Sequence, residues 1–332
     1  MKELLEKLAT TYGPSGNEEL VREVIKEEIR DCVDKIDVDA LGNLIAVRKG
    51  SEHGKRIMLA AHMDQIGLMV THIDEKGFLR FTNIGGISAL NTIRRKVIFK
   101  NGITGVVSYE GGIEDIKDIK LNRMYIDIGA SDYDEALNMV NIGDVAVYYS
   151  QFIENNGHFI SAAMDNRSGC AVLIKTIKEL KESPNELYFV FTVQEELGLR
   201  GARTAAFAID PDLAVAIDVT GTGDTPRCRP MAVSLGEGPA IKVKDASIIA
   251  HPKVKELMVS TAKQNGIPYQ LEILDAGGTD SGAIHLTKEG IPSGVLSIPC
   301  RYIHSDNEVV DGFDMEKGVD LMVAILSKNI DL

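Results

Sequence analysis

The sequence contains no tryptophan, and only 5% of its 332 residues are aromatic. Proteins that bind polysaccharide use flat aromatic rings on which sugars stack, so this scarcity argues against a polysaccharide-binding surface. Positive charge is also scarce, because 36 lysine and arginine residues face 49 aspartate and glutamate residues and the formal net charge is -13. An acidic surface repels phosphate groups, so we expect neither a nucleic acid nor a membrane as a partner.

Long apolar runs and paired cysteines are absent from the sequence too. No stretch is long and apolar enough to span a bilayer, and the first residues, MKELLEKLATTYGPSGNEE, predict a short amphipathic helix rather than the apolar core of a signal peptide. Four cysteines are scattered without a C-x-x-C pair: Cys32, Cys170, Cys228 and Cys300. Cys170 lies in an apolar helical segment, where a reduced, buried thiol is expected. We therefore expect a cytoplasmic protein.

The pattern of apolar residues changes twice along the chain. Residues 1–65 and 161–332 alternate helix and strand signals, which is typical of an α/β fold with a mainly parallel sheet covered by helices on both faces. Residues 66–160 contain short alternating runs broken by glycine, and Asn101-Gly102 between two of them indicates a hairpin. We therefore predict a discontinuous α/β domain, residues 1–65 and 161–332, interrupted by an all-β, barrel-like insertion of residues 66–160.

Individual elements of the α/β parts follow from helical spacing or from short apolar runs. The expected helices cover residues 20–36, 167–181, 254–265, 281–288 and 314–327. The expected strands cover residues 43–47, 57–61, 187–193, 213–217 and 294–298.

Residues able to bind metal lie at the ends of four apolar strands. His62 ends RIMLAAH, Glu195 and Glu196 follow LYFVFTVQ, Asp218 lies in LAVAIDVT, and His304 ends GVLSIPCRYIH. In open α/β sheets ligands bind beyond the carboxyl ends of the strands, so these side chains are expected around one cleft. Asp165, just before a helix in SAAMDNRSG, is expected to point its carboxylate the same way.

Each of these residues also has a structural explanation. Asp165 is a candidate helix N-cap, Asp218 a candidate turn residue, and a lone histidine after a strand is often structural. The structural explanation for Glu195 and Glu196 is a pair of charged side chains exposed to solvent. The coincidence of so many such residues at strand ends nevertheless favours a shared site. Two adjacent ionised carboxylates repel, and their burial is unfavourable unless a cation compensates, which a metal ion would do.

Two histidines and three carboxylates form a ligand set that suits zinc, cobalt or manganese. Five ligands exceed what one tetrahedral zinc ion with an open position accepts. Two ions about 3.5–4 Å apart, bridged by one carboxylate, fit this set better. Because neighbouring side chains point differently, one of Glu195 and Glu196 can bind metal while the other acts as a general base.

The remaining histidines are weaker candidates. Four are expected to be structural or solvent-facing: His53, His72, His158 and His251. His285 follows the glycine-rich DAGGTDSGA. That loop, residues 277–282, opens a helix whose amides could bind an oxyanion or a carboxylate. The alternative is an ordinary helix start capped by Thr279 or Asp280, with the loop as a wall of the pocket.

Seven segments jointly match one known family: YGPSGNEE, LAAHMDQIGLMV, SAAMDNRSGC, VQEELGLRGA, AIDVT, AGGTDSGAIH and RYIHSDNEVV, in this order. Along nearly its full length the chain resembles the tetrahedral (TET) aminopeptidases, the glutamyl aminopeptidase family of dinuclear metallopeptidases. The resemblance implies a zinc-exopeptidase-like fold, with the β insertion as a dimerisation domain. It also implies peptide substrates, two zinc or cobalt ions per subunit, and a homo-oligomer built from dimers, a hollow dodecamer.

The resemblance further implies roles for individual residues. The implied metal ligands are His62, Asp165, Glu196, Asp218 and His304. Asp165 would bridge the ions, Glu196 and His304 would complete one site, and the other two ligands would complete the second. Glu195 would be the catalytic base, and Asp64 would orient His62, as ligand histidines generally need.

Two further expectations concern the backbone near these ligands. The resemblance implies that the peptide bond between Asp165 and Asn166 is cis. One departure from the family is visible, because Asp306 follows Ser305 where many relatives carry proline. His304 is unaffected, so only the shape of this loop is expected to differ.

The predicted function is therefore a dinuclear metallo-aminopeptidase with Glu195 as general base. A metal-dependent deacylase or other amidohydrolase would use the same chemistry, and a non-catalytic metal-binding scaffold would leave Glu195 without a purpose. A glycoside hydrolase of the glucanase type would need carboxylates about 5–10 Å apart across a sugar. Glu195 and Glu196, adjacent at one strand end, do not naturally face each other in that way.

Overall fold

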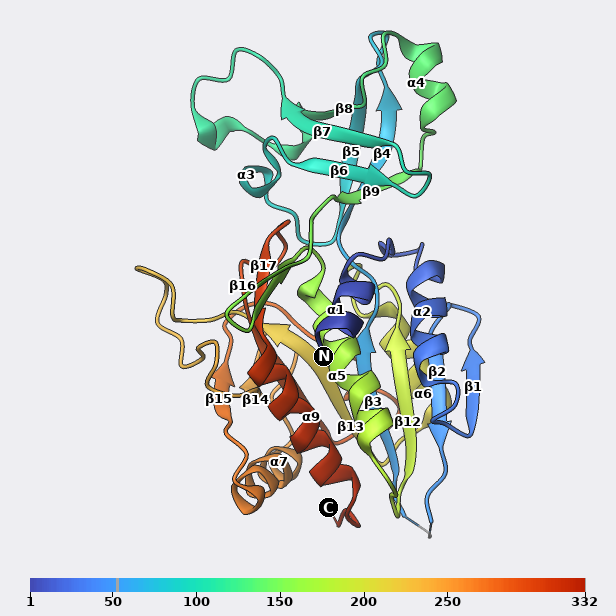
Figure 1. Cartoon of the computed structure of the whole chain (residues 1–332), viewed down its shortest axis with the longest axis vertical. Helices are drawn as coiled ribbons and strands as arrows, with labels where there is room; N and C mark the ends of the chain where they lie inside the picture. The colour runs from blue at the N-terminus through green and yellow to red at the C-terminus, as the bar shows by residue number, and fades with distance from the viewer. Residues whose placement is uncertain (52–53, 332) are drawn as a thin grey trace.

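Separate hydrophobic cores fill a helix-covered sheet and a smaller barrel. The computed structural model describes residues 1–51 and 54–331. In Figure 1 the barrel lies above the sheet, and extended segments connect the two parts. Since strands alternate with helices on either side of one all-β segment in the sequence, this arrangement is the expected one.

The large sheet has 11 strands, of which the central four run parallel in the order β12-β3-β13-β16. These four are β12 (Glu186–Thr192), β3 (Arg56–His62), β13 (Leu213–Thr220) and β16 (Ser293–Arg301). The others are β1 (Lys35–Val38), β2 (Leu44–Arg48), β10 (Ile153–Asn155), β11 (His158–Ser161), β14 (Ala240–Lys244), β15 (Gln270–Ile273) and β17 (Glu308–Asp311). The carboxyl ends of the parallel strands therefore meet at one edge.

Both faces of the sheet are buried, as the strand β3 shows. Its residues Ile57 and Leu59 pack into one core, and Met58 and Ala60, which point the opposite way, pack into another. The helices that cover the sheet or extend its layers are α1 (Lys2–Ala9), α2 (Glu19–Ile29), α5 (Met164–Glu179), α6 (Arg200–Ile209), α7 (Pro252–Asn265), α8 (Ser281–Ile284) and α9 (Gly312–Leu326). This burial explains why the central strands are continuously apolar.

The barrel closes in the order β4-β5-β8-β7-β6-β9. Its strands and short helices are β4 (Gly67–Ile73), β5 (Leu79–Ile84), α3 (Ala89–Thr92), β6 (Lys96–Phe99), β7 (Thr104–Tyr109), β8 (Met124–Asp127), α4 (Tyr133–Met139) and β9 (Val145–Tyr148). Gly102, with φ +88°, turns the chain between β6 and β7, where the sequence indicated a hairpin. The predicted fold class, a mainly parallel sheet with helices and an inserted barrel, is confirmed.

The predicted end of the insertion, residue 160, lies within the strand β11 (His158–Ser161). The strand β11 pairs with β17 of the large sheet, and β10, which lies within residues 66–160, pairs with β11. His158 consequently belongs to the large sheet and not to the insertion. Alternating apolar residues are compatible with a strand in either the barrel or the large sheet. Only the neighbouring strand in the structure shows to which of them such a segment belongs. We propose that the barrel unit ends near residue 149.

Other differences concern element ends. The helix expected over residues 20–36 ends at Ile29, and Ile36 lies in β1, which pairs with β2. The helix expected over residues 281–288 is a single turn. The sequence did not predict α6, β14, β15 or β17. His53 lies outside the described residues.

The cysteines are free thiols, and Cys170 is buried as predicted. None of the helices in the described part of the chain combines the length and the apolar character that crossing a bilayer requires.

Candidate metal centre

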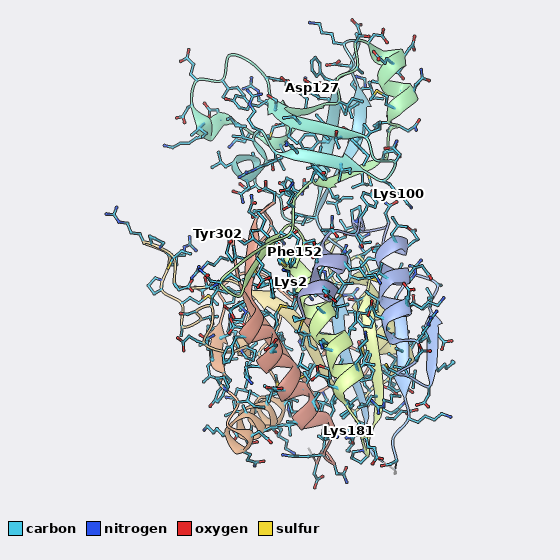
Figure 2. All side chains as sticks on the ribbon, viewed as in Figure 1. Lys2, Lys100, Asp127, Phe152, Lys181 and Tyr302 are labelled. Carbon is cyan, nitrogen blue, oxygen red and sulfur yellow. The ribbon has the colours of Figure 1, made fainter. Side chains whose placement is uncertain are left out.

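The predicted site residues gather at the carboxyl edge of the central strands. His62 ends β3 and Asp218 lies near the end of β13, while Glu196 and His304 follow β12 and β16 within a few residues. In Figure 2, Tyr302, two residues before His304, lies on the side of the sheet that faces the barrel, and Lys181 lies at the opposite end. The site thus lies at the end of the large sheet that faces the barrel.

Asp165 lies at the centre of the cluster and contacts both histidines. Its Oδ1 is 3.1 Å from His62 Nε2, and its Oδ2 is 3.2 Å from His304 Nε2. Asp218 Oδ1 lies 3.6 Å from His62 Nε2, and Glu196 Oε1 lies 3.2 Å from His304 Nε2. The side chains therefore form two neighbouring groups, and the Asp165 carboxylate takes part in both.

Each group suits a divalent ion. One consists of His62, Asp165 and Asp218, and the other of Asp165, Glu196 and His304. In each group one potential ligand atom per residue lies within 4.8 Å of those of the other two. Each offers one imidazole nitrogen and two carboxylate oxygens. Three protein ligands with a position left for water or substrate are characteristic of catalytic zinc sites. The donor set therefore fits two ions of the zinc or cobalt type.

The electrostatics of the cluster also favour bound cations. Burial alone would lower the pKa of His62, but the charges of Glu195 and Asp218 and the hydrogen bond to Asp165 raise it well above its usual value. Burial also opposes protonation of His304, yet hydrogen bonds to Asp165 and Glu196 raise its pKa to about 12. The carboxylates around the two histidines thus raise the pKa of both, because their negative charge favours a nearby cation.

Several carboxyl groups of the cluster also have a raised pKa, which shows the same shortage of positive charge. Burial raises the pKa of Glu195 well above its usual value, and the charges of Asp218 and Asp280 add to the effect. Burial likewise raises the pKa of Asp280 to about 7 and that of Glu308 to about 8. Ions in the two groups would supply the positive charge that these buried acids lack.

Glu195 lies beside the two groups without belonging to either. Its Oε2 is 3.9 Å from His62 Nε2. The residue lines a cavity of about 400 Å³, and the five candidate ligands line the same cavity. Other lining residues are glycines or apolar side chains, apart from Thr220: Gly198, Leu199, Val219, Gly221, Leu274, Gly277, Gly278 and Ile303. A carboxylate free of the ligand groups therefore faces the space in which a substrate would lie.

Asp64 supports the backbone beside the cluster more directly than it supports His62. Its Oδ1 is 3.6 Å from His62 Nδ1, which lies closer, at 3.1 Å, to the Asp64 carbonyl oxygen. Its carboxylate accepts hydrogen bonds from the amides of Glu195 (3.0 Å) and Glu196 (3.2 Å) and from the Ser15 hydroxyl (2.6 Å). The sequence did not indicate these bonds.

Two glycines of the barrel segment approach the cluster closely. A Cβ atom at Gly86 would lie 2.9 Å from His304 Nδ1, and one at Gly85 would lie 2.5 Å from Glu196 Oε2. Gly85 also has φ +76°, a conformation that other residues rarely adopt. The loop after β5 therefore needs small residues here to let the barrel contact the site.

The peptide bond between Asp165 and Asn166 is cis, as the resemblance implied. Asp165 does not cap a helix with its side chain. Asp306 is the residue at which this chain differs from the family pattern. Its Oδ2 lies 3.2 Å from a guanidinium nitrogen of Arg95 in the barrel segment. The loop that carries His304 is thereby linked to the barrel.

The other sequence candidates lie elsewhere. His72, His158, His251 and His285 do not line the cavity. Gly277 and Gly278 do, so the loop forms a pocket wall, as one alternative held. The expected helix cap is wrong, because neither Thr279 nor Asp280 makes a side-chain cap, and the Asp280 carboxylate instead accepts from the Thr192 hydroxyl (2.5 Å).

Comparisons with known proteins give a consistent result. The model of a family described as M42 glutamyl aminopeptidase matches residues 42–321. A protein from Acetivibrio thermocellus is 60% identical over 323 residues, which cover 97% of each chain. The structure is similar to that of an aminopeptidase from the archaeon Desulfurococcus kamchatkensis, with 40% identity, a TM-score of 0.95 and coverage of 98% of this chain and 94% of that one. It is also similar to the Pyrococcus horikoshii TET1 peptidase, which can assemble into a tetrahedron or a large octahedral shell, with 36% identity, a TM-score of 0.87 and coverage of 98% and 99%.

Proposed function

Because the chain belongs to the M42 glutamyl aminopeptidase family and is an aminopeptidase, we propose that it hydrolyses peptides with a pair of divalent ions, zinc or cobalt. The proposed ligands are His62, Asp165, Glu196, Asp218 and His304. The observation that carries this proposal is the sharing of one carboxylate, Asp165, by two three-residue groups. When bound, such ions polarise a carbonyl oxygen and make water more acidic.

Glu195 is proposed as the general base. It faces the cavity from a position outside both ligand groups. Its carboxylate would take a proton from the attacking water and return it to the nitrogen of the leaving peptide.

The restriction of cleavage to the N-terminal residue of a peptide substrate would follow from charge. A free α-amine is a cation near neutral pH, and the carboxylates of the cluster attract it. An internal peptide bond offers no such charge and would bring a second chain segment into a cavity of about 400 Å³. The acidic cluster therefore favours the first residue of a peptide.

The cavity lining favours an apolar first residue. Leu199, Leu274 and Ile303 contribute apolar side chains, and no lysine or arginine is among the lining residues of the described chain. The Thr220 hydroxyl donates to Glu272 (2.8 Å) and is thus engaged. An acidic side chain would enter without a partner for its charge, which is unfavourable.

The first test is a panel of aminoacyl p-nitroanilides. We expect cleavage of the leucyl and methionyl compounds, with kcat/KM at least about tenfold lower for the glutamyl and lysyl compounds, because pocket mismatches commonly cost this much or more. N-acetyl-leucyl p-nitroanilide should resist cleavage. Hydrolysis of N-acyl amino acids instead would favour the deacylase alternative, and release of sugar from a soluble glucan would favour the glucanase alternative.

We also propose a homo-oligomer built from barrel-mediated dimers, a dodecamer in its complete form. The similarity to the Pyrococcus horikoshii TET1 peptidase over 98% of this chain, barrel included, supports this proposal. The free cysteine thiols support a cytoplasmic location, where thiols stay reduced.

A further inference from the structure

Buried carboxylates hold the backbone of the segments that carry the cluster. Glu308, the first residue of β17, is 2% exposed. Its Oε2 accepts the Asp165 amide (2.9 Å), and its Oε1 accepts the His304 amide (2.6 Å). Glu18, 4% exposed, accepts the Gly16 amide (2.8 Å) and the Gln194 amide (3.2 Å).

These amides have no acceptor within regular secondary structure. Gln194 and His304 have φ values of +53° and +63°, in the left-handed region that residues with a Cβ rarely adopt. Asp165 has non-helical dihedral angles that interrupt the start of α5. Amides removed from water need an acceptor, so each of these three depends on a side chain. The acceptors of Asp165 and Gln194 are 143 and 176 residues away, and that of His304 is four residues away.

A neutral acceptor would satisfy one such amide without adding negative charge. A carboxylate at position 308 instead places a further negative charge beside Asp165, which by itself is unfavourable. A carboxylate, however, can accept from two donors in different directions with its two oxygens. Glutamine has one acceptor oxygen and an NH2 group that only donates, so it cannot replace Glu308 at both amides.

We propose that Glu308 and Glu18 are positioning residues for the active centre. Glu308 sets the placement of Asp165 relative to His304, and so the shape of the metal-binding group to which both belong. Glu18 holds Gln194 and thereby aims the turn that carries Glu195 and Glu196. This inference rests on the proposed function, in which the cluster binds metal ions and Glu195 is the general base.

The two glutamates differ in how many of their carboxylate oxygens accept hydrogen bonds, and this difference gives distinct expectations for their variants. Glu308 uses both of its oxygens, whereas Glu18 accepts both of its amides with Oε1 alone. Glutamine should therefore serve at position 18, where its carbonyl oxygen can take the place of Oε1, but not at position 308. Alanine should fail at position 18.

The first measurement is the affinity of the whole protein for Co²⁺, determined by competition with a chelator, together with the visible absorption of the bound ion. We expect Glu308→Gln to weaken binding at one or both ions by about 10- to 100-fold, the range seen when support of metal ligands is lost. The absorption spectrum should change, because the ligand arrangement changes. The unmodified protein provides the reference, and if it bound no Co²⁺ the proposed function itself would fail.

The matched control is Asp314→Asn. Asp314 is buried on α9 and accepts two backbone amides with its two oxygens, Gly236 (2.8 Å) and Gly238 (2.7 Å), and none of the three residues lines the cavity. We expect both this variant and Glu308→Gln to lose thermal stability, but only Asp314→Asn to keep the Co²⁺ affinity and spectrum. Unchanged affinity and spectrum in a folded Glu308→Gln variant would reduce Glu308 to a structural role and overturn the proposal.

A second pair of variants tests the role proposed for Glu18, whether or not Glu308→Gln folds. Glu18→Gln should keep kcat within about twofold, and Glu18→Ala should lower kcat by about tenfold with KM nearly unchanged, within the range expected for support of functional groups. The glutamine variant thus serves as the conservative rescue. Equal activity of the two variants, whether both high or both low, would contradict the role given to Glu18.

Discussion

A Glu195→Gln variant is expected to retain its metal ions and to lose turnover by about 10²- to 10⁴-fold, the contribution typical of a general base. The substitution keeps the shape of the side chain, and Glu195 belongs to neither ligand group, so metal binding should persist. Its backbone amide would still donate to Asp64 (3.0 Å). Metal content per subunit and kcat on a leucyl p-nitroanilide are the two measurements.

The adjacent residue offers a matched control. Glu196→Gln makes the same change one position along the chain, but Glu196 is a member of the group with Asp165 and His304. This variant should lose metal together with turnover. A Glu195→Gln variant with near wild-type turnover would remove Glu195 from the base role, and one without metal would make it a ligand.

Replacing the shared carboxylate should have the largest effect on metal binding. Asp165→Asn removes a charge from both groups and leaves a nitrogen that cannot ligate in place of Oδ1 or Oδ2. We expect the affinity for both ions to fall by more than the 10- to 100-fold typical of residues that only support ligands, and activity to be lost. Equilibrium dialysis against Co²⁺ measures the affinity.

Asp218→Asn is the informative comparison, because Asp218 belongs to one group only. It should impair one ion and spare the other. Asp306→Asn, near His304 but paired with Arg95, should leave both ions bound. If Asp165→Asn bound both ions as tightly as the unmodified protein, the bridging role would be wrong.

Much of the site could be predicted because it depends on strand ends. His62 and Asp218 lie on adjacent parallel strands, and parallel strands in one sheet deliver their carboxyl ends to one edge. The pattern of apolar runs therefore located them without knowledge of the strand order. The fold class was predictable for the same reason, since runs separated by helices indicate a parallel sheet.

The residues that hold the site in place could not be found in this way. Glu308 and Asp165 are 143 residues apart, and Glu18 and Gln194 are 176 apart, and no periodicity connects positions so distant. Glu18 appeared in the sequence only within the segment YGPSGNEE, with no role of its own. Asp280 resembled a helix cap for a local reason, whereas its partner, Thr192, lies 88 residues away.

The most direct test of the central claim is a titration of the metal-free protein with Co²⁺, with activity on a leucyl p-nitroanilide measured at each step. The shared Asp165 carboxylate predicts that full activity requires two ions per subunit. Full activity with one ion per subunit, or activity that persists in excess chelator, would contradict the dinuclear site.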